Sequence, residues 1–169
     1  GDQLQQHWPF LHAGNLEPFP SDPAVQDAWR AYHEGRFEDA VRIGRDHGGL
    51  GLVPAAFAAT IYAHYLEPDE EKKVQIFEMA VELGERATAV CPDNANAYYM
   101  YAVAQGRYSQ FVSMIEALAK GIAPRIRDAV QRCLELEPRH AEGHVTLAGW
   151  HAEIVDKVGG MLAGLSFGA

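Results

Sequence analysis

Three histidines near the C-terminal end have a spacing that could bind a metal ion. His140, His144 and His151 lie within about 40° of one another on a helical wheel. At about 1.5 Å rise per residue, however, His140 and His151 are about 16 Å apart, so only the first two could share an ion. We therefore expect packing histidines, with His144 and His151 in the core, and no metal site.

The same segment carries three carboxylates, Glu142, Glu153 and Asp156, which could serve acid–base catalysis. Glu142 falls in a first helical turn, where the helix dipole favours a carboxylate in any case. No nucleophile or oxyanion-forming loop accompanies them. The glycine-rich run 48–51 follows no strand and precedes no Lys-Ser/Thr, so it predicts a helix stop rather than a phosphate loop. We expect no catalytic residue, no cofactor and no enzyme.

Arg107 and Tyr108 are the best candidates for partner recognition. They combine a charge and an aromatic ring at the end of a helix, followed by the polar pair Ser109 and Gln110. Such a combination suits the binding of an extended peptide. The alternative is a solvated turn with a packing tyrosine.

The element that positions these residues is an internal repeat. The stretch Arg86–Gln110 returns in altered form as Arg132–Val155, shifted by 46 residues, so that Pro92 coincides with Pro138. Each copy is a helix end, a proline-containing turn and a new helix, because proline cannot continue a helix. Two such units in register indicate an array of helix pairs.

Composition limits the classes of partner. A chain of 169 residues with 48% hydrophobic residues fits one globular domain. The net charge of −9 disfavours nucleic acid and anionic membrane surfaces. No segment approaches the roughly 18 apolar residues of a membrane span. The two cysteines, Cys91 and Cys133, have no metal-type spacing and are expected as buried free thiols.

Residues 1–20 contain three prolines and are predicted to be an extended N-terminal lead-in. Residues 21–169 are predicted to form a helical repeat domain of about four units, and the absence of strand alternation indicates an all-α fold. The predicted helices cover residues 23–34, 37–46, 53–66, 71–90, 94–105, 109–120, 122–137 and 140–158.

The turn between the first two helices resembles the tetratricopeptide repeat family. Gly35, Phe37 and Ala40 match its turn glycine, its aromatic residue and its close-packing alanine, and Ala28 takes its small crossing position. The resemblance implies an α-α superhelix of antiparallel helix pairs. The family unit has 34 residues, so the 46-residue spacing implies a lengthened third unit, expected as a longer helix pair.

The third and fourth units carry a more specific resemblance. Their sequence, Tyr101–Gly159, looks like a group of largely uncharacterised bacterial tetratricopeptide proteins and is distantly similar to the regulator of microtubule dynamics family. In such relatives the ending Gly164–Ala169 leads into another helix. The last unit is therefore expected to be incomplete, with one face of helix 140–158 partly uncovered.

These resemblances imply a non-enzymatic module that binds a partner protein or peptide on its concave face. The candidate residues of that face are Tyr32, His33, Asn96, Tyr99, Arg107, Tyr108, Glu142 and Glu153.

Two alternatives stay open. One is a small-ligand or transporter accessory protein, similar to the T-component of bacterial tripartite transporters, with a pocket of Trp29, Tyr99 and Phe111. The other is a homo-oligomer built through the apolar tail Gly159–Ala169. The chain starts without methionine, as after removal of a signal peptide, so an exported location is favoured over a cytoplasmic one.

Overall fold

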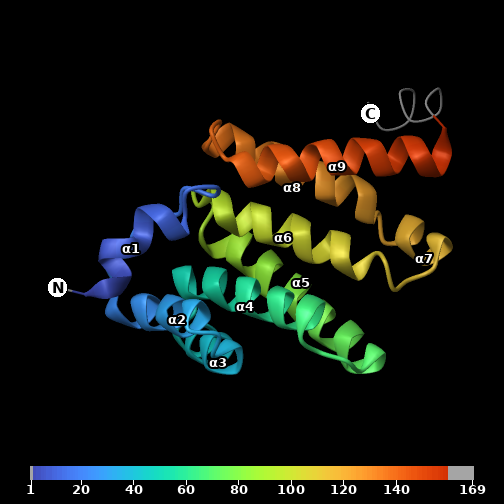
Figure 1. The fold of residues 1–169 in the computed structure, drawn as a ribbon. Helices are drawn as coiled ribbons and strands as arrows, with labels where there is room; N and C mark the ends of the chain where they lie inside the picture. The colour runs from blue at the N-terminus through green and yellow to red at the C-terminus, as the bar shows by residue number, and fades with distance from the viewer. Residues whose placement is uncertain (1, 160–169) are drawn as a thin grey trace.

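The computed structural model describes residues 2–159, except the side chains of Met114 and Val158. This part of the chain consists of helices and turns without a strand, which confirms the predicted all-α fold (Figure 1). The helices are α1 (Gln3–Leu11), α2 (Pro23–His33), α3 (Phe37–His47), α4 (Leu52–Tyr65), α5 (Glu70–Val90), α6 (Ala95–Tyr108), α7 (Met114–Ala119), α8 (Ile122–Leu136) and α9 (Ala141–Val158), with a single 3-10 turn, η1 (Gly49–Gly51).

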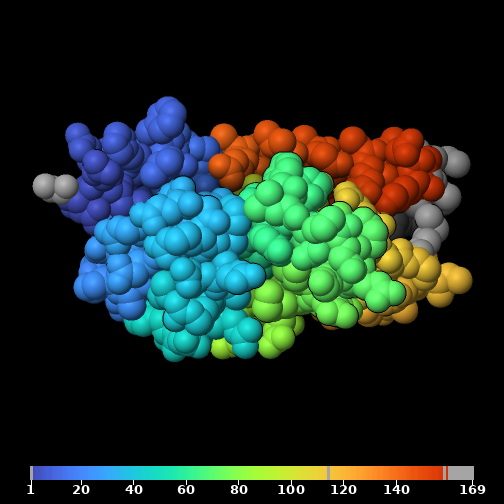
Figure 2. Space-filling model, turned by 60° about the horizontal axis from the view of Figure 1, so that its bottom comes forward, coloured from blue at the N-terminus to red at the C-terminus, as the bar shows by residue number. Residues whose placement is uncertain are grey.

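The longer helices form pairs. α2 packs on α3, α4 on α5, and α6 on α8, while α9 packs on α8. The first members, α2, α4, α6 and α9, follow one another from the lower left to the top of Figure 1. In Figure 2 the atoms of the N-terminal helices adjoin the beginning of α9, so the two ends of the array approach each other at one edge.

Local signals set the helix ends as the sequence predicts. Asp22 caps α2 by accepting a hydrogen bond from the Ala24 N–H. Gly35 follows α2 with a φ of +76°, and Gly48 follows α3 with a φ of +72°, values that glycine adopts without strain. Ala40 is fully buried at the crossing of the first pair.

The N-terminal segment differs from the prediction, because residues 3–11 form helix α1 rather than an extended lead-in. Asp2 caps this helix by accepting a hydrogen bond from the Leu4 N–H. Leu4 and Trp8, one helical turn apart, are buried in the same core as α2 and α4. Burial of this face outweighs the presence of Pro9 inside the helix.

The segment between α6 and α8 differs from the prediction of a longer helix pair. The predicted helix 109–120 shrinks to the six residues of α7, capped by Ser113. Residues 109–113 form turns that swing Phe111 inward, where its ring lies 5.6 Å from that of Phe77. The extra residues therefore make a separate short helix beside α8 and not a longer pair.

The apolar core has two main clusters. One contains Trp29 and joins α1, α2, α4, α5 and α6. The other contains Phe77 and joins α4, α5, α6, α8 and α9. α4 lies between them with ten buried residues, so it is apolar all around. Within the described residues no helix is both long and apolar enough to span a membrane.

The core face of α9 is rotated relative to the repeat alignment. His144, expected in the core, is exposed, as is Ala148. Trp150 and Ile154 are buried instead, and the Trp150 indole donates a hydrogen bond to the Ala123 carbonyl at 2.9 Å. The exposed face includes Val145, which is 73% exposed. The proposed oligomerisation tail, from residue 160 onward, lies outside the described residues.

Candidate functional site

A groove of about 460 Å³ separates α6 from α9. The small residues Ala102 and Gly106 line it from α6, and Ala141 and Gly149 line it from α9. Ile126 of α8 and the buried Trp150 also contribute. Since the two helices run in the same direction, the groove has one end near their N-termini and one near their C-termini (Figure 1).

Two predicted residues lie at the C-terminal end of the groove. Arg107 is half-buried and forms no ion pair among the described residues. Glu153 is exposed and pairs with Lys157 at 2.6 Å, one turn further along α9. A partly desolvated guanidinium without a carboxylate partner is suited to bind an anionic group of a partner.

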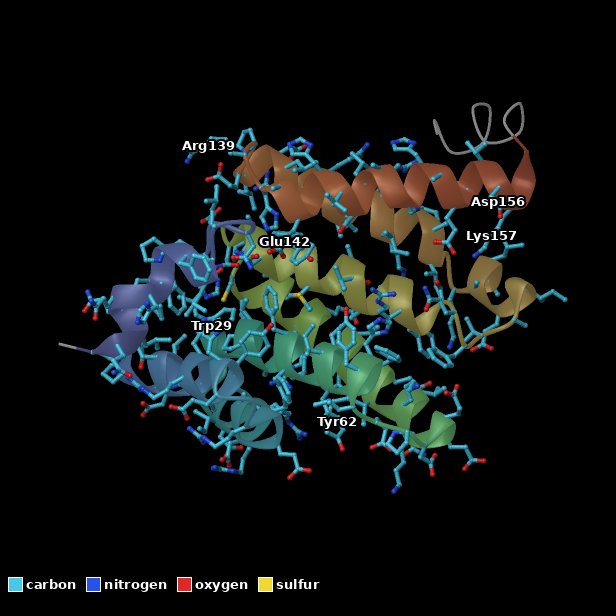
Figure 3. The ribbon with its side chains drawn as sticks, in the orientation of Figure 1. Trp29, Tyr62, Arg139, Glu142, Asp156 and Lys157 are labelled. Carbon is cyan, nitrogen blue, oxygen red and sulfur yellow. The ribbon has the colours of Figure 1, made fainter. Side chains whose placement is uncertain are left out.

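Tyr99 and Glu142 line the N-terminal end of the same groove. Glu142 extends from the first turn of α9 into the space between α9 and α6 (Figure 3). Its backbone N–H donates to the Gly14 carbonyl at 3.2 Å, which brings the α1–α2 loop against α9. Burial, reinforced by the Glu142 charge, raises the pKa of Tyr99. Its phenol therefore stays protonated and can donate a hydrogen bond.

Beyond Tyr99 and Glu142 the groove adjoins a smaller cavity of about 260 Å³ that is lined by Tyr32 and His33. Burial, with the Glu142 charge, raises the pKa of Tyr32 to about 12. Burial, with the neighbouring His12, lowers the pKa of His33 to about 4. Six of the eight predicted residues thus line one continuous groove and cavity: Tyr32, His33, Tyr99, Arg107, Glu142 and Glu153.

Asn96 does not face the groove. It is 1% exposed, and its amide donates to the Asn15 carbonyl at 2.9 Å and to the Glu17 carboxylate at 2.8 Å. Its side-chain oxygen lies 3.1 Å from Nε2 of His140, whose Nδ1 accepts the Gly143 N–H. Asn96 therefore joins the α1–α2 loop to the beginnings of α6 and α9, because a fully buried amide requires partners for all its polar atoms.

Tyr108 also lies away from the groove. It is 6% exposed within the Phe77 cluster, and its hydroxyl donates to Glu78 at 3.1 Å and accepts from Lys120 at 2.8 Å. The expected pocket of Trp29, Tyr99 and Phe111 does not form either. Trp29 and Phe111 belong to different clusters.

Glu17, which is 7% exposed, was not identified from the sequence. Burial raises its pKa to about 7, against the opposing hydrogen bonds from Asn94 and Asn96. Glu17 falls in the segment expected to be extended, so its burial depends on a tertiary contact. The local signal for this network was the polar residues after the two proline turns. Asn94 caps α6, His140 caps α9, and Asn96 follows in the first turn of α6.

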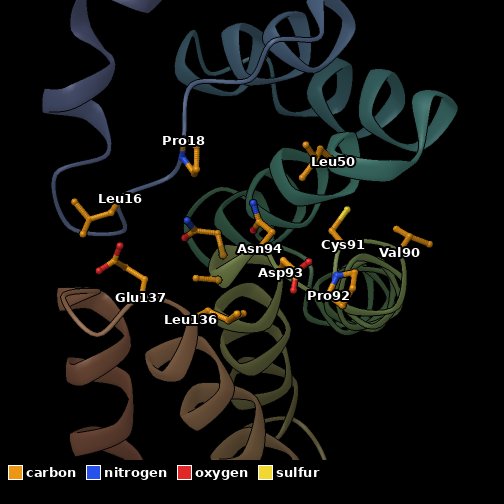
Figure 4. A pocket seen from close by; sticks show the side chains of 12 residues that line it. Leu16, Pro18, Leu50, Val90, Cys91, Pro92, Asp93, Asn94, Leu136 and Glu137 are labelled. Atoms are coloured by element: carbon orange, nitrogen blue, oxygen red, sulfur yellow. The ribbon is translucent and has the colours of Figure 1, made fainter.

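On the outer side of this network four connecting segments of the chain converge around a crevice of about 490 Å³. Figure 4 shows Leu16 and Pro18 of the α1–α2 loop facing the turn of Cys91 and Pro92, with Glu137 nearby. Of the predicted site residues only Asn96 lines it. Among the described residues no group of three or more His, Cys, Asp or Glu side chains could hold a metal ion.

Residues 53–157 match the model of a family described as regulator of microtubule dynamics protein 1-3, which covers more than half of the chain. The chain belongs to this family. The match begins in α4 and ends in α9, so the groove between α6 and α9 lies wholly inside the family region. Searches among curated proteins and among solved structures returned no match.

Proposed function

We propose that the chain is a non-enzymatic module that binds an extended peptide segment of a partner protein in the groove between α6 and α9. Tyr99 and Arg107 are eight residues apart on α6, which corresponds to about 12 Å of groove. That length accommodates three to four residues of extended peptide, at about 3.3 Å each. The small side chains along both helices give a backbone room to approach.

The observation that carries this proposal is Arg107. Its guanidinium is half-buried in the groove, and no described carboxylate pairs with it, whereas Glu153 nearby already pairs with Lys157. A peptide with an acidic side chain or a terminal carboxylate opposite Arg107 would supply the missing charge. Hydrogen bonds from arginine to a carboxylate are among the stronger polar contacts in proteins.

We also propose that the helix pairs are tetratricopeptide-type units, of the kind found in bacterial binding proteins. Such units would support the proposed role in partner binding. The positive φ of Gly35, the buried Ala28 and Ala40, and the row of first helices agree with that repeat. Stacked pairs of this type provide an extended surface for partners. The name of the matched family describes regulators of microtubule dynamics, and a regulator acting on another protein needs such a surface.

The test is selection of peptides from a displayed random library on the unaltered protein, followed by measured affinities. We expect enriched peptides to carry an acidic group, and Arg107→Glu to weaken their binding at least tenfold without changing helicity or melting. Arg42→Glu is the matched control, because Arg42 is exposed on α3 and, among the described residues, pairs with Asp39 alone. Equal affinity for Arg107→Glu and the unaltered protein would show that the groove is not the binding site.

The small-ligand alternative is favoured by one observation, the cavity of about 260 Å³ next to the groove. The residues that line this cavity differ from the expected set of Trp29, Tyr99 and Phe111, and they indicate a different class of ligand.

A further inference from the structure

The cavity beside the groove is enclosed by five parts of the fold. Leu11, His12 and Asn15 come from the end of α1 and the loop after it, and the other lining residues come from α2, α4, α6 and α9. They are Tyr32, His33, Phe57, Thr60, Ile61, Tyr99, Met100, Val103 and Glu142. The α1–α2 loop thus closes a side of the cavity that the family region alone leaves open.

One wall of the cavity is aromatic. The ring of Phe57 lies 5.8 Å from that of Tyr32 and 6.0 Å from that of Tyr99. Trp29 packs behind them, 5.3 Å from Phe57. Aromatic faces within about 6 Å of a cation attract it through their quadrupoles.

The charge of the lining is negative. Glu142 contributes a carboxylate that forms no ion pair among the described residues, and neither lysine nor arginine lines the cavity. The two imidazoles face each other, with Nε2 of His12 and Nε2 of His33 3.0 Å apart. Burial lowers the pKa of both, so neither supplies a positive charge at neutral pH.

Thr60 supplies an independent sign of a ligand. It is 2% exposed and lines the cavity, yet its hydroxyl has no hydrogen-bond partner among the described residues. Buried hydroxyl groups are nearly always paired in folded proteins. A donor that reaches this hydroxyl from the cavity would satisfy it.

We propose that this cavity binds an alkylammonium group. Its N–H bonds would be shared between the Glu142 carboxylate and the Thr60 hydroxyl, and its methylene groups would pack on Phe57 and Tyr99. The ligand is either a free small amine or the lysine side chain of a protein, since both present the same group. The inference goes beyond the peptide groove, because it depends on residues of α2 and α4 that do not line the groove.

The experiment is titration calorimetry of the full chain with n-butylammonium chloride, with 1-butanol as the neutral probe of the same length. We expect butylammonium to bind and butanol not to bind, and Glu142→Gln to weaken butylammonium at least tenfold. Thr60→Val should weaken it about threefold to tenfold. Binding of butanol as strong as that of butylammonium, or unchanged binding to Glu142→Gln, would overturn the proposal.

A second variant keeps the test decisive if Glu142→Gln fails to fold. A Cβ atom at Gly14 would lie 2.7 Å from Oε1 of Glu142, so Gly14→Ala should displace the carboxylate without removing it. We expect weakened butylammonium binding with an unchanged melting temperature. Gly106→Ala is the matched control, because its nearest added contact is at 3.9 Å. Equal binding by Gly14→Ala and the unaltered protein would count against Glu142 as the anion.

The source of the ammonium group is decided by a third titrant, Nα-acetyl-lysine amide. Binding as tight as that of butylammonium supports a lysine side chain, and weaker binding supports a free amine. Arg107→Glu should leave butylammonium binding intact. A loss of peptide binding in the groove and a loss of amine binding in the cavity are therefore distinguishable results.

Discussion

Successive first helices of the array meet in two different ways. α4 and α6 pack directly, with Ala59 and Ala104 buried in the same cluster. Between α6 and α9 lies an open groove, although small residues line both sides. Small residues alone therefore do not bring two helices into contact. The contacts that fix each helix at other points decide whether the two helices touch.

Two contacts fix α9 beside the open groove. At the N-terminal end Asn96 of α6 contacts His140, the cap of α9. Further along, Trp150 anchors α9 to the beginning of α8 rather than to α6. These contacts fix α9 while the groove between α9 and α6 stays open, which leaves room for a ligand.

The largest expected effect comes from removing the N-terminal anchor. Asn96→Ala deprives Glu17, the Asn15 carbonyl and His140 of a hydrogen-bond partner inside the protein. Leaving several buried polar groups unpaired should lower the free energy of unfolding by about 4 kcal/mol. Urea unfolding followed by circular dichroism measures this loss.

Gln105→Ala is the control for that variant. Gln105 is a buried amide on the same helix, but within the described part of the chain its side chain makes a single hydrogen bond, to Tyr101 at 3.1 Å. A loss of about 1 kcal/mol is expected there. If both variants lost the same stability, the contact between α6 and α9 would not depend on the polar network.

The second effect is a pH dependence caused by Glu17. Its pKa is raised from an ordinary 4.5 to about 7, so between these values the folded chain binds more protons than the unfolded chain. The contribution of Glu17 to stability is therefore fully favourable below pH 4.5 and is lost progressively up to about pH 7. The loss amounts to about 3 kcal/mol.

His33 works in the opposite direction in part of this range. Its pKa is lowered to about 4, so the unfolded chain binds the extra proton and stability rises with pH up to about 6.5. The measurement is therefore the difference in unfolding free energy between the unaltered chain and Glu17→Gln, from pH 4.5 to 8. That difference should shift against the unaltered chain as pH rises, and a constant difference would contradict the raised pKa.

Features that depend on local sequence were predictable. The caps, the glycine turns and the helical periodicity gave eight helices, and seven of them lie close to their predicted limits. The errors occurred where tertiary contact outweighed local preference. The burial of Leu4 and Trp8 produced α1 despite Pro9, and the inward turn of Phe111 shortened the predicted helix 109–120 to α7.

The placement of candidate residues along one groove was predictable where they share one face of a helix. Arg107 and Glu142 were found because they fall on the groove side of α6 and α9. Asn96 and Tyr108 were placed incorrectly because their neighbours come from distant segments, the α1–α2 loop and α7. Thr60 could not be recognised, since an unpaired hydroxyl is a property of the packed fold and not of the sequence.

The smallest effect compares two helical glycines, the buried Gly84 at the α5–α6 contact and the exposed Gly149 beside the groove. Gly84 of α5 faces α6 so closely that an added Cβ would lie 2.8 Å from the Tyr101 Cα, whereas at Gly149 of α9 nothing lies within 4 Å. Gly84→Ala must shift backbone and should cost about 2 kcal/mol. Gly149→Ala should gain about 0.8 kcal/mol from helix propensity alone.

Thermal and urea unfolding of both variants test this comparison. A lower free energy of unfolding for Gly84→Ala and a higher one for Gly149→Ala support a closed α5–α6 contact beside an open α6–α9 groove. A loss at Gly149 would instead mean that α9 lies against α6 in solution, and the groove would then be too narrow for a peptide.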